Sequence, residues 1–139
     1  MRSVLAAALA AAAVFTLACG GIVDPSKNVT DTFTGTIPVQ GTSKGAAFST
    51  DKQGEYSVKV TEMTPSSTLF FGTVLAQGLS DGSCETSGLS LPIIQQNSFG
   101  TVGTSVLNSA IYPGHYCVFL FDIGTFTVAQ NYTLTVSHP

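Results

Sequence analysis

Apolar and polar residues alternate with a period of two along most of the chain after residue 28. Residues 56–60 and 132–137 show this alternation most regularly, and shorter runs begin near residue 29 and over 46–50. Successive side chains of a strand point to opposite faces of a sheet, so the alternation predicts strands with one buried face. No stretch in this part of the chain has sustained helical periodicity.

Two further segments, 69–76 and 117–121, are apolar on both faces and are therefore predicted to be central strands that are covered on both sides. Clusters of Gly, Pro, Ser and Asp punctuate the chain between the predicted strands at 51–54, 64–67, 78–83 and 112–114. Short strands with turns roughly every 8–12 residues are typical of antiparallel sandwiches. Residues 29–139 are predicted to form an all-β domain of seven to eight strands, an antiparallel β-sandwich or jelly roll.

The first 18 residues have the organisation of a secretory signal peptide. Arg2 precedes an apolar run, Val4–Leu17, which is followed by small residues. The run is shorter than the about 20 residues that a bilayer-spanning helix needs. Residues 1–18 are therefore predicted to direct export and to be removed.

The segment Thr16–Gly21 resembles the lipobox of bacterial lipoproteins, in which the cysteine becomes the lipidated first residue of the mature chain. Cys19 takes that place here, while Thr16 stands where the motif usually has Leu. The alternative is an ordinary signal peptide with an incidental cysteine. The resemblance implies a lipidated tether over 19–28 and a domain held at a membrane of the bacterial cell envelope, with the outer membrane favoured. Two acyl chains provide a stable anchor without a spanning helix.

The chain has three cysteines, so pairing them in disulfides within the chain would leave one over. Lipidation of Cys19 leaves Cys84 and Cys117, which are expected to form a disulfide in an oxidising compartment. Two buried free thiols are the alternative. A zinc site is not expected, because neither cysteine has a second Cys or His ligand close in sequence.

Composition and charge narrow the possible partners. Charged residues are 9% of the chain, apolar residues 44%, and the formal net charge is −3. The apolar content excludes a disordered chain. The four lysines are dispersed, and nucleic-acid binding needs a basic face that displaces phosphate counterions, so nucleic acid is excluded as a partner.

Five motifs follow one another in the order found in a known family: Phe33–Thr36, Phe48, Gly54–Val60, Pro113–Val118 and Tyr132–Val136. This arrangement is similar to the bacterial pre-peptidase C-terminal domain. The resemblance covers nearly all of the chain after the leader and implies a compact jelly-roll-like sandwich of the kind appended to secreted proteases and other exported enzymes. The chain departs from that family's usual setting, because a lipid anchor replaces the peptidase domain.

Some members of this family bind calcium, but the two neighbouring carboxylates here, Asp81 and Glu85, fall short of the six to eight oxygens that calcium prefers. No metal or cofactor is therefore predicted. An immunoglobulin fold is the structural rival. It requires a core Trp and a Tyr two residues before the second cysteine; the chain has no Trp, and Tyr116 directly precedes Cys117.

Four residues are candidate catalytic groups, and none is predicted to act as one. Ser43 is the centre of a Gly-x-Ser-x-Gly match, but that motif works at a strand-to-helix turn, and here it lies in what we interpret as a flexible loop between strands. His115 is expected in a turn, and His138 in a frayed terminus. Asp122 is interpreted as a strand-end or turn residue rather than a general acid.

The preferred function is that of a non-catalytic envelope lipoprotein whose sandwich is a binding or interaction module. Its expected partners are the membrane, through the lipid, and a protein or glycan, contacted through exposed aromatic residues. An accessory or structural subunit of a secreted enzyme or surface assembly is the alternative, and a small hydrolase is the third hypothesis.

Overall fold

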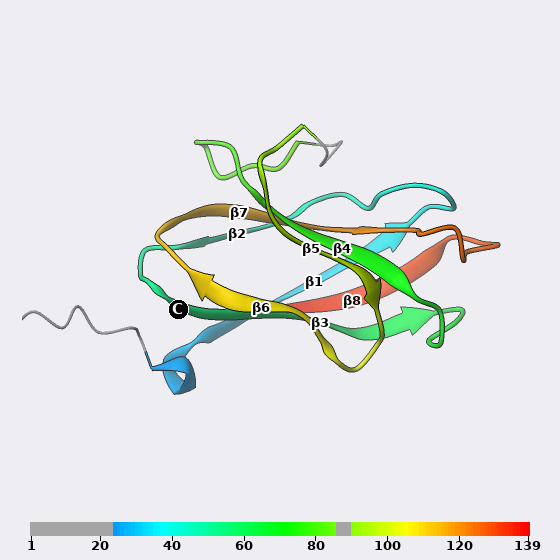
Figure 1. Ribbon diagram of the computed structural model, residues 1–139, viewed down its shortest axis with the longest axis horizontal. Coiled ribbons are helices and arrows are strands. Elements are labelled where there is room, and N and C mark those ends of the chain that lie inside the picture. The colour runs from blue at the N-terminus through cyan, green and yellow to red at the C-terminus, as the bar shows by residue number, and fades with distance from the viewer. Residues whose placement is uncertain (1–23, 86–89) are drawn as a thin grey trace, which may run out of the picture.

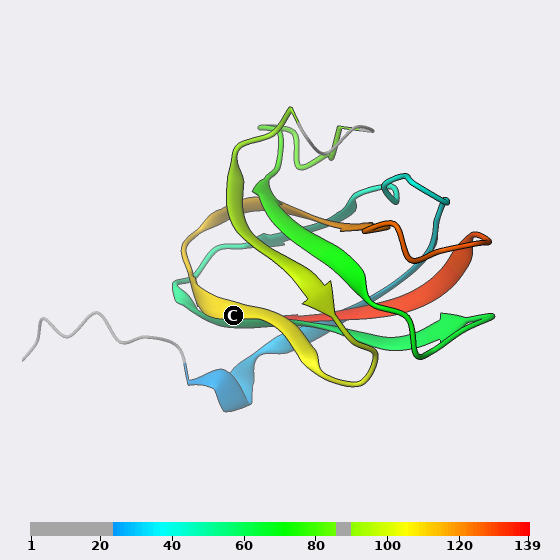
Figure 2. The same cartoon turned by 45° about the vertical axis from the view of Figure 1, so that its right-hand side comes forward.

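The computed structural model describes residues 24–85 and 90–139, and it forms two four-stranded antiparallel sheets packed face to face (Figures 1 and 2). The predicted signal peptide and Cys19 lie outside the described residues. The elements are η1 (Pro25–Lys27), β1 (Val29–Ile37), β2 (Ala46–Thr50), β3 (Gly54–Thr64), β4 (Phe71–Gln77), β5 (Ile93–Gly100), β6 (Ser105–Ile111), β7 (Gly114–Phe121) and β8 (Gln130–His138). Among these elements there is no helix long and apolar enough to cross a bilayer.

The strand order identifies the topology. One sheet has the order β1-β8-β3-β6 and the other β2-β7-β4-β5. Strands pair first with last, second with seventh, third with sixth and fourth with fifth, and these pairs alternate between the two sheets. An eight-stranded double sheet of this order is a jelly roll. The predicted all-β sandwich is therefore confirmed, including the strand count.

The two segments that are apolar on both faces are the central strands of one sheet, as predicted. Six of the seven residues of β4 are buried, and β7 is buried from Tyr116 to Leu120. Their inward side chains, such as Leu75 and Val118, join the core between the sheets. Their outward side chains form a second apolar cluster on the outer face of the same sheet: Val74, Ala76, Cys117, Phe119 and Phe121.

The outer face of the other sheet is polar. Thr30, Thr32 and Thr34 of β1 are exposed, and they lie opposite Ser137, Thr135 and Thr133 of β8. Hydroxyl side chains at these positions can form hydrogen bonds with solvent, so this face is suited to remain exposed. Within residues 24–85 and 90–139, the two outer faces therefore differ in kind, and the apolar cluster lies on that of β2-β7-β4-β5.

Candidate functional site

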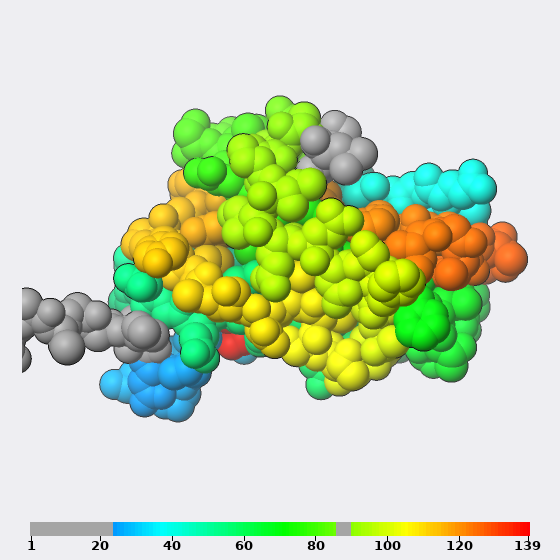
Figure 3. Space-filling model, viewed as in Figure 1, coloured from blue at the N-terminus to red at the C-terminus, as the bar shows by residue number. Residues whose placement is uncertain are grey.

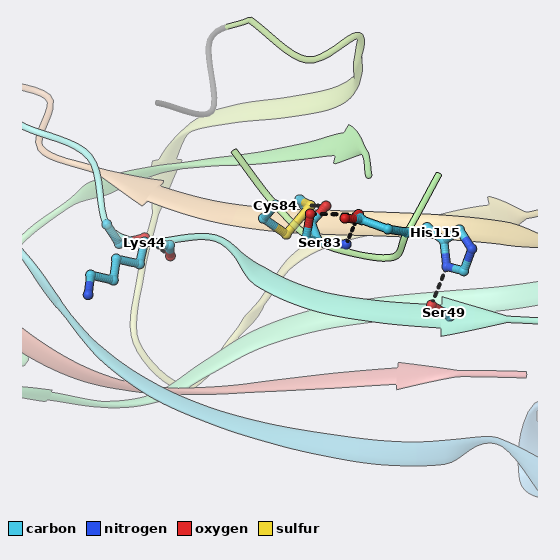
Figure 4. Close-up of a disulfide and its surroundings, with 8 residues drawn as sticks. Lys44, Ser49, Ser83, Cys84 and His115 are labelled. Carbon is cyan, nitrogen blue, oxygen red and sulfur yellow. Dashed lines mark hydrogen bonds between the residues drawn. A yellow bond between two sulfur atoms is a disulfide. The ribbon is translucent and has the colours of Figure 1, made fainter. Parts of the chain in front are cut away.

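A disulfide joins Cys84 to Cys117, with the two Cα atoms 5.8 Å apart. This confirms the pairing predicted from the sequence and excludes the alternative of two free thiols. Cys117 belongs to the apolar cluster on the outer face of the β2-β7-β4-β5 sheet. The disulfide therefore holds the segment after β4, which contains Cys84, against this face (Figure 4). Leu79, Cys84 and Leu91 cover one half of the apolar cluster there.

The other half of this outer face holds a pocket of about 200 Å³, which we call the outer-face pocket. Its floor is apolar and consists of Val74, Phe119 and Phe121 from the two central strands. Its rim carries polar groups, and the lining residues there are Gln40, Gly41, Thr42, Gln96 and Asp122. An apolar floor with a few polar groups at its edge is the usual construction of a small-molecule site, because burial supplies affinity and the polar groups orient the ligand.

The aromatic floor depends on a glycine. The tip of the Phe121 ring lies where a side chain at position 72 would be, since a Cβ on Gly72 would come within 2.0 Å of Cζ of that ring. Gly72 therefore lets the Phe121 ring cross strand β4 and form part of the pocket floor. A larger residue would force the ring away from this position.

Gln40 is the one described non-glycine residue with a left-handed backbone, at φ 52°. Such a conformation is strained for residues other than glycine and occurs in turns and at functional sites. The surrounding hydrogen bonds hold it in place. The Gln40 N–H donates to Oδ2 of Asp122 at 2.8 Å, and the Asp122 N–H donates to the Gly41 carbonyl at 3.0 Å.

The second carboxylate oxygen of Asp122 organises the turn after β7. Its Oδ1 accepts hydrogen bonds from the backbone N–H groups of Gly124, Thr125 and Phe126. Burial alone would raise the pKa of the Asp122 carboxyl, but these donors and the Gln40 N–H outweigh burial and hold the pKa below its usual value of 3.8. Asp122 is thus the turn residue that the sequence indicated. Both oxygens of its carboxylate accept hydrogen bonds from backbone N–H groups.

Ser43 corrects one prediction. The Gly-x-Ser-x-Gly segment was expected to be a flexible loop, but Ser43 is buried, with 1% of its surface exposed. Its Oγ accepts from the Leu120 N–H at 3.0 Å and donates to the Lys44 carbonyl at 3.0 Å. Its hydroxyl therefore fastens the β1–β2 connection to β7 and is not presented to a substrate.

His138 corrects a second prediction, because it is not frayed. It is 4% exposed, pairs through Nε2 with Oδ2 of Asp31 at 3.0 Å, and its ring lies 5.0 Å from that of Phe48. No sequence pattern indicates this burial, because it results from the pairing of β8 with β1, which extends to His138 itself, opposite Val29. Long-range strand pairing protects a terminus that would otherwise fray.

His115 is the second residue of β7 rather than a turn residue, and its Nδ1 lies 2.7 Å from Oγ of Ser49 (Figure 4). Within the part of the chain that the structure describes, no carboxylate is hydrogen-bonded to this ring. Nearby Asp81 has a lowered pKa, chiefly because Ser83 donates two hydrogen bonds to it. Ser49 and His115 thus form a pair without the third, orienting group of a triad.

A larger pocket of about 410 Å³ lies between the start of the domain and β6, lined by residues such as Pro25, Asn28, Glu55 and Asn108. Its lining includes one aromatic residue, Tyr56, which is itself buried, and otherwise consists of polar and small residues and one proline. It lacks the aromatic floor of the outer-face pocket, which we therefore take as the better candidate site. The described residues contain no group of three metal-ligating side chains.

No protein-family model matches the chain, and no curated protein matches its sequence. Among solved structures, the chain is similar to the crystal structure of the Yersinia pseudotuberculosis-derived mitogen. The TM-score is 0.55 at 14% sequence identity, and the match covers 81% of this chain and 87% of that one. At this identity the likeness shows a shared fold alone.

Proposed function

We propose that the chain is an exported, lipid-anchored, non-catalytic module that binds a neutral saccharide residue in the outer-face pocket. The observation that carries the proposal is the construction of the pocket. Two glutamine side chains, Gln40 and Gln96, belong to a rim around an apolar floor that includes Phe119 and Phe121.

The chemistry of the lining favours a neutral sugar. Each glutamine amide offers both a donor and an acceptor, and sugar hydroxyls need partners of both kinds. The aromatic floor suits the apolar C–H face of a sugar ring. The one carboxylate of the rim, Asp122, stays ionised and would disfavour an anionic ligand, and its oxygens already accept hydrogen bonds from four backbone donors.

The size of the pocket limits the ligand. Pockets for drug-sized molecules measure roughly 300–1,000 Å³, whereas the outer-face pocket measures about 200 Å³. It has room for one ring, so we expect a single residue of a glycan to enter it.

The position of the pocket agrees with a tethered binder. The tether would leave the domain at η1, and β1 runs from there to the β1–β2 connection, which contains Gln40 (Figure 1). Nine residues of strand span about 30 Å. A domain anchored through Cys19 would thus carry its pocket at the end away from the membrane. The disulfide adds support, because such bonds persist in oxidising compartments.

The binding experiment uses arrays and titrations with neutral oligosaccharides of glucose, galactose, mannose and N-acetylglucosamine. Gln96→Ala and Gln40→Gly should each weaken binding about tenfold or more, since each removes a hydrogen-bonding amide. Gln40→Gly is the sharper variant, because glycine suits the left-handed backbone and should preserve or raise stability. Gln53→Ala, an exposed glutamine outside the pocket, is the matched control. Binding that both pocket variants retain would refute the assignment.

The anchor and the lack of catalysis are tested separately. Cys19→Ser should move the protein from the membrane fraction into the soluble extract, and a variant that still sediments with membranes would contradict lipidation. The purified protein should not hydrolyse esters, peptides or glycans. Turnover that disappears in His115→Ala would instead support the hydrolase hypothesis.

A further inference from the structure

Strand β5 is an edge strand with an unusual surface. Among the described strands it pairs with β4 alone, so one of its edges has no strand partner among them. Ile93, Ile94 and Phe99 are 47%, 51% and 73% exposed. The strand runs across the face of the molecule shown in Figure 3, where residues 93–111 are yellow-green to yellow. Unpaired edges with exposed apolar side chains are templates for pairing with another chain.

The other three edge strands each carry a feature that discourages pairing. Strand β1 carries Asp31, and β2 has only five residues and is followed by Asp51 and Lys52. Charges and short length both discourage edge pairing. The carbonyls of Val106 and Asn108 on β6 are already occupied by side-chain amides of Asn97 and Gln95. Strand β5 itself contains no charged residue and no proline.

The sequence of β5 is complementary to itself when two copies run antiparallel. With a two-fold axis at Gln96, Ile93 lies opposite Phe99 of the second copy and Gln95 lies opposite Asn97. One apolar pair and one amide pair then form on each side of the axis, Ile94 lies opposite Ser98, and no like charges are brought together. The irregularities in the β4–β5 register lie on either side of residues 95–97, so the regular part of the strand surrounds Gln96.

We propose that two copies of this chain associate through β5, antiparallel and centred on Gln96. The pairing joins two β2-β7-β4-β5 sheets into one continuous eight-stranded sheet. Gln96 also lines the outer-face pocket, so the two pockets come to lie on either side of the junction. The association does not depend on what the pocket binds.

The interface is small, because one strand from each copy supplies it. Interfaces of this size are weak and transient. We therefore expect a dissociation constant on the order of 10 µM in solution. Attachment to a shared membrane would raise the effective concentration and favour the dimer.

Cross-linking tests the register directly, using the full chain with Cys19→Ser so that the protein is soluble. Gln96→Cys should form a disulfide-linked dimer on oxidation with diamide, because the residue meets its own copy across the two-fold axis. Ser98→Cys is the matched control. In the proposed register its two copies lie about 13 Å apart along the strands, beyond the reach of a disulfide.

Sedimentation of the chain without added cysteines provides an independent measurement. It should show a monomer–dimer equilibrium that Phe99→Lys and Ile94→Lys shift to monomer, while both variants keep the circular dichroism spectrum of the unmodified chain. Equal cross-linking by Ser98→Cys and Gln96→Cys would overturn the proposed register. A chain that stays monomeric at several hundred micromolar, well above the expected constant, would overturn the dimer. Neither result would bear on saccharide binding.

Discussion

Asp122 holds Gln40 in a left-handed backbone conformation through a 2.8 Å hydrogen bond from the Gln40 N–H to Oδ2. The two residues lie 82 positions apart in sequence. Their contact joins the β1–β2 connection to the turn after β7 and thereby fixes one wall of the outer-face pocket. A turn residue on one segment thus determines where a candidate ligand-binding side chain lies on another.

Replacing Asp122 with Asn should destabilise the domain by about 1–3 kcal/mol, because hydrogen bonds to a charged acceptor are lost or weakened. The variant should also bind ligand less well, since Gln40 is no longer held. Urea unfolding near neutral pH measures the first effect. An unchanged free energy of unfolding would show that the contact contributes nothing.

The same residue predicts a dependence on pH. Its pKa is lowered in the folded state, so its contribution to stability is present above the unfolded value, 3.8, and is lost as pH falls through the lower folded value. The stability difference between the unmodified chain and Asp122→Asn should therefore shrink at about pH 3 and below. A difference that grows on acidification would contradict the assigned charge state.

Ser43→Ala should lower the free energy of unfolding by about 1–3 kcal/mol, because it leaves the buried N–H of Leu120 without an acceptor. Ser49→Ala is the matched control. Ser49 is exposed, and its removal should change stability by less than about 0.5 kcal/mol. Thermal melts of both variants decide the point, and equal melting temperatures would contradict a structural role for Ser43.

Removing the disulfide with the double substitution Cys84→Ser and Cys117→Ser should destabilise the domain by roughly 3–4 kcal/mol, because the cross-link spans 33 positions. For a domain of this size the melting temperature should fall by about 10 °C or more. The variant should also expose the apolar cluster that Leu79 and Leu91 cover, which binding of a hydrophobic dye can report. A melting temperature within error of the unmodified chain would contradict this account.

Tyr56 should titrate at unusually high pH. Burial of its phenol, together with nearby Tyr116, raises its pKa to about 12. A raised folded pKa means that the neutral phenol stabilises the fold below the unfolded value of 10, and that this contribution is lost as pH rises from about 10 to 12. Ultraviolet titration should show a late phenolate signal that is absent from Tyr56→Phe. A Tyr56 signal near pH 10 in the folded protein would contradict it.

The sequence by itself determined the fold class, the approximate ranges of six of the eight strands and the disulfide, but it assigned no range to β5 or β6. Period-two alternation reports which faces are buried, and the doubly apolar runs correctly indicated that β4 and β7 are central. These features are local, because the burial pattern of a strand follows from the alternation of apolar and polar types among its consecutive residues. Asp122 was likewise recognisable as a turn residue from its neighbours.

Only the tertiary structure decided the pocket and the roles of Ser43 and His138. The pocket combines residues from the β1–β2 connection, β4, β5 and β7, and no spacing in the sequence reveals that these segments meet. The sequence predicts a flexible loop at Ser43 because the group that it accepts a hydrogen bond from, the Leu120 N–H, lies far away in the chain. It predicts a frayed terminus at His138 because the partners of that side chain lie on β1 and β2. In a jelly roll most contacts join residues far apart in the chain, so a side chain's environment is set by strand pairing rather than by its sequence neighbours.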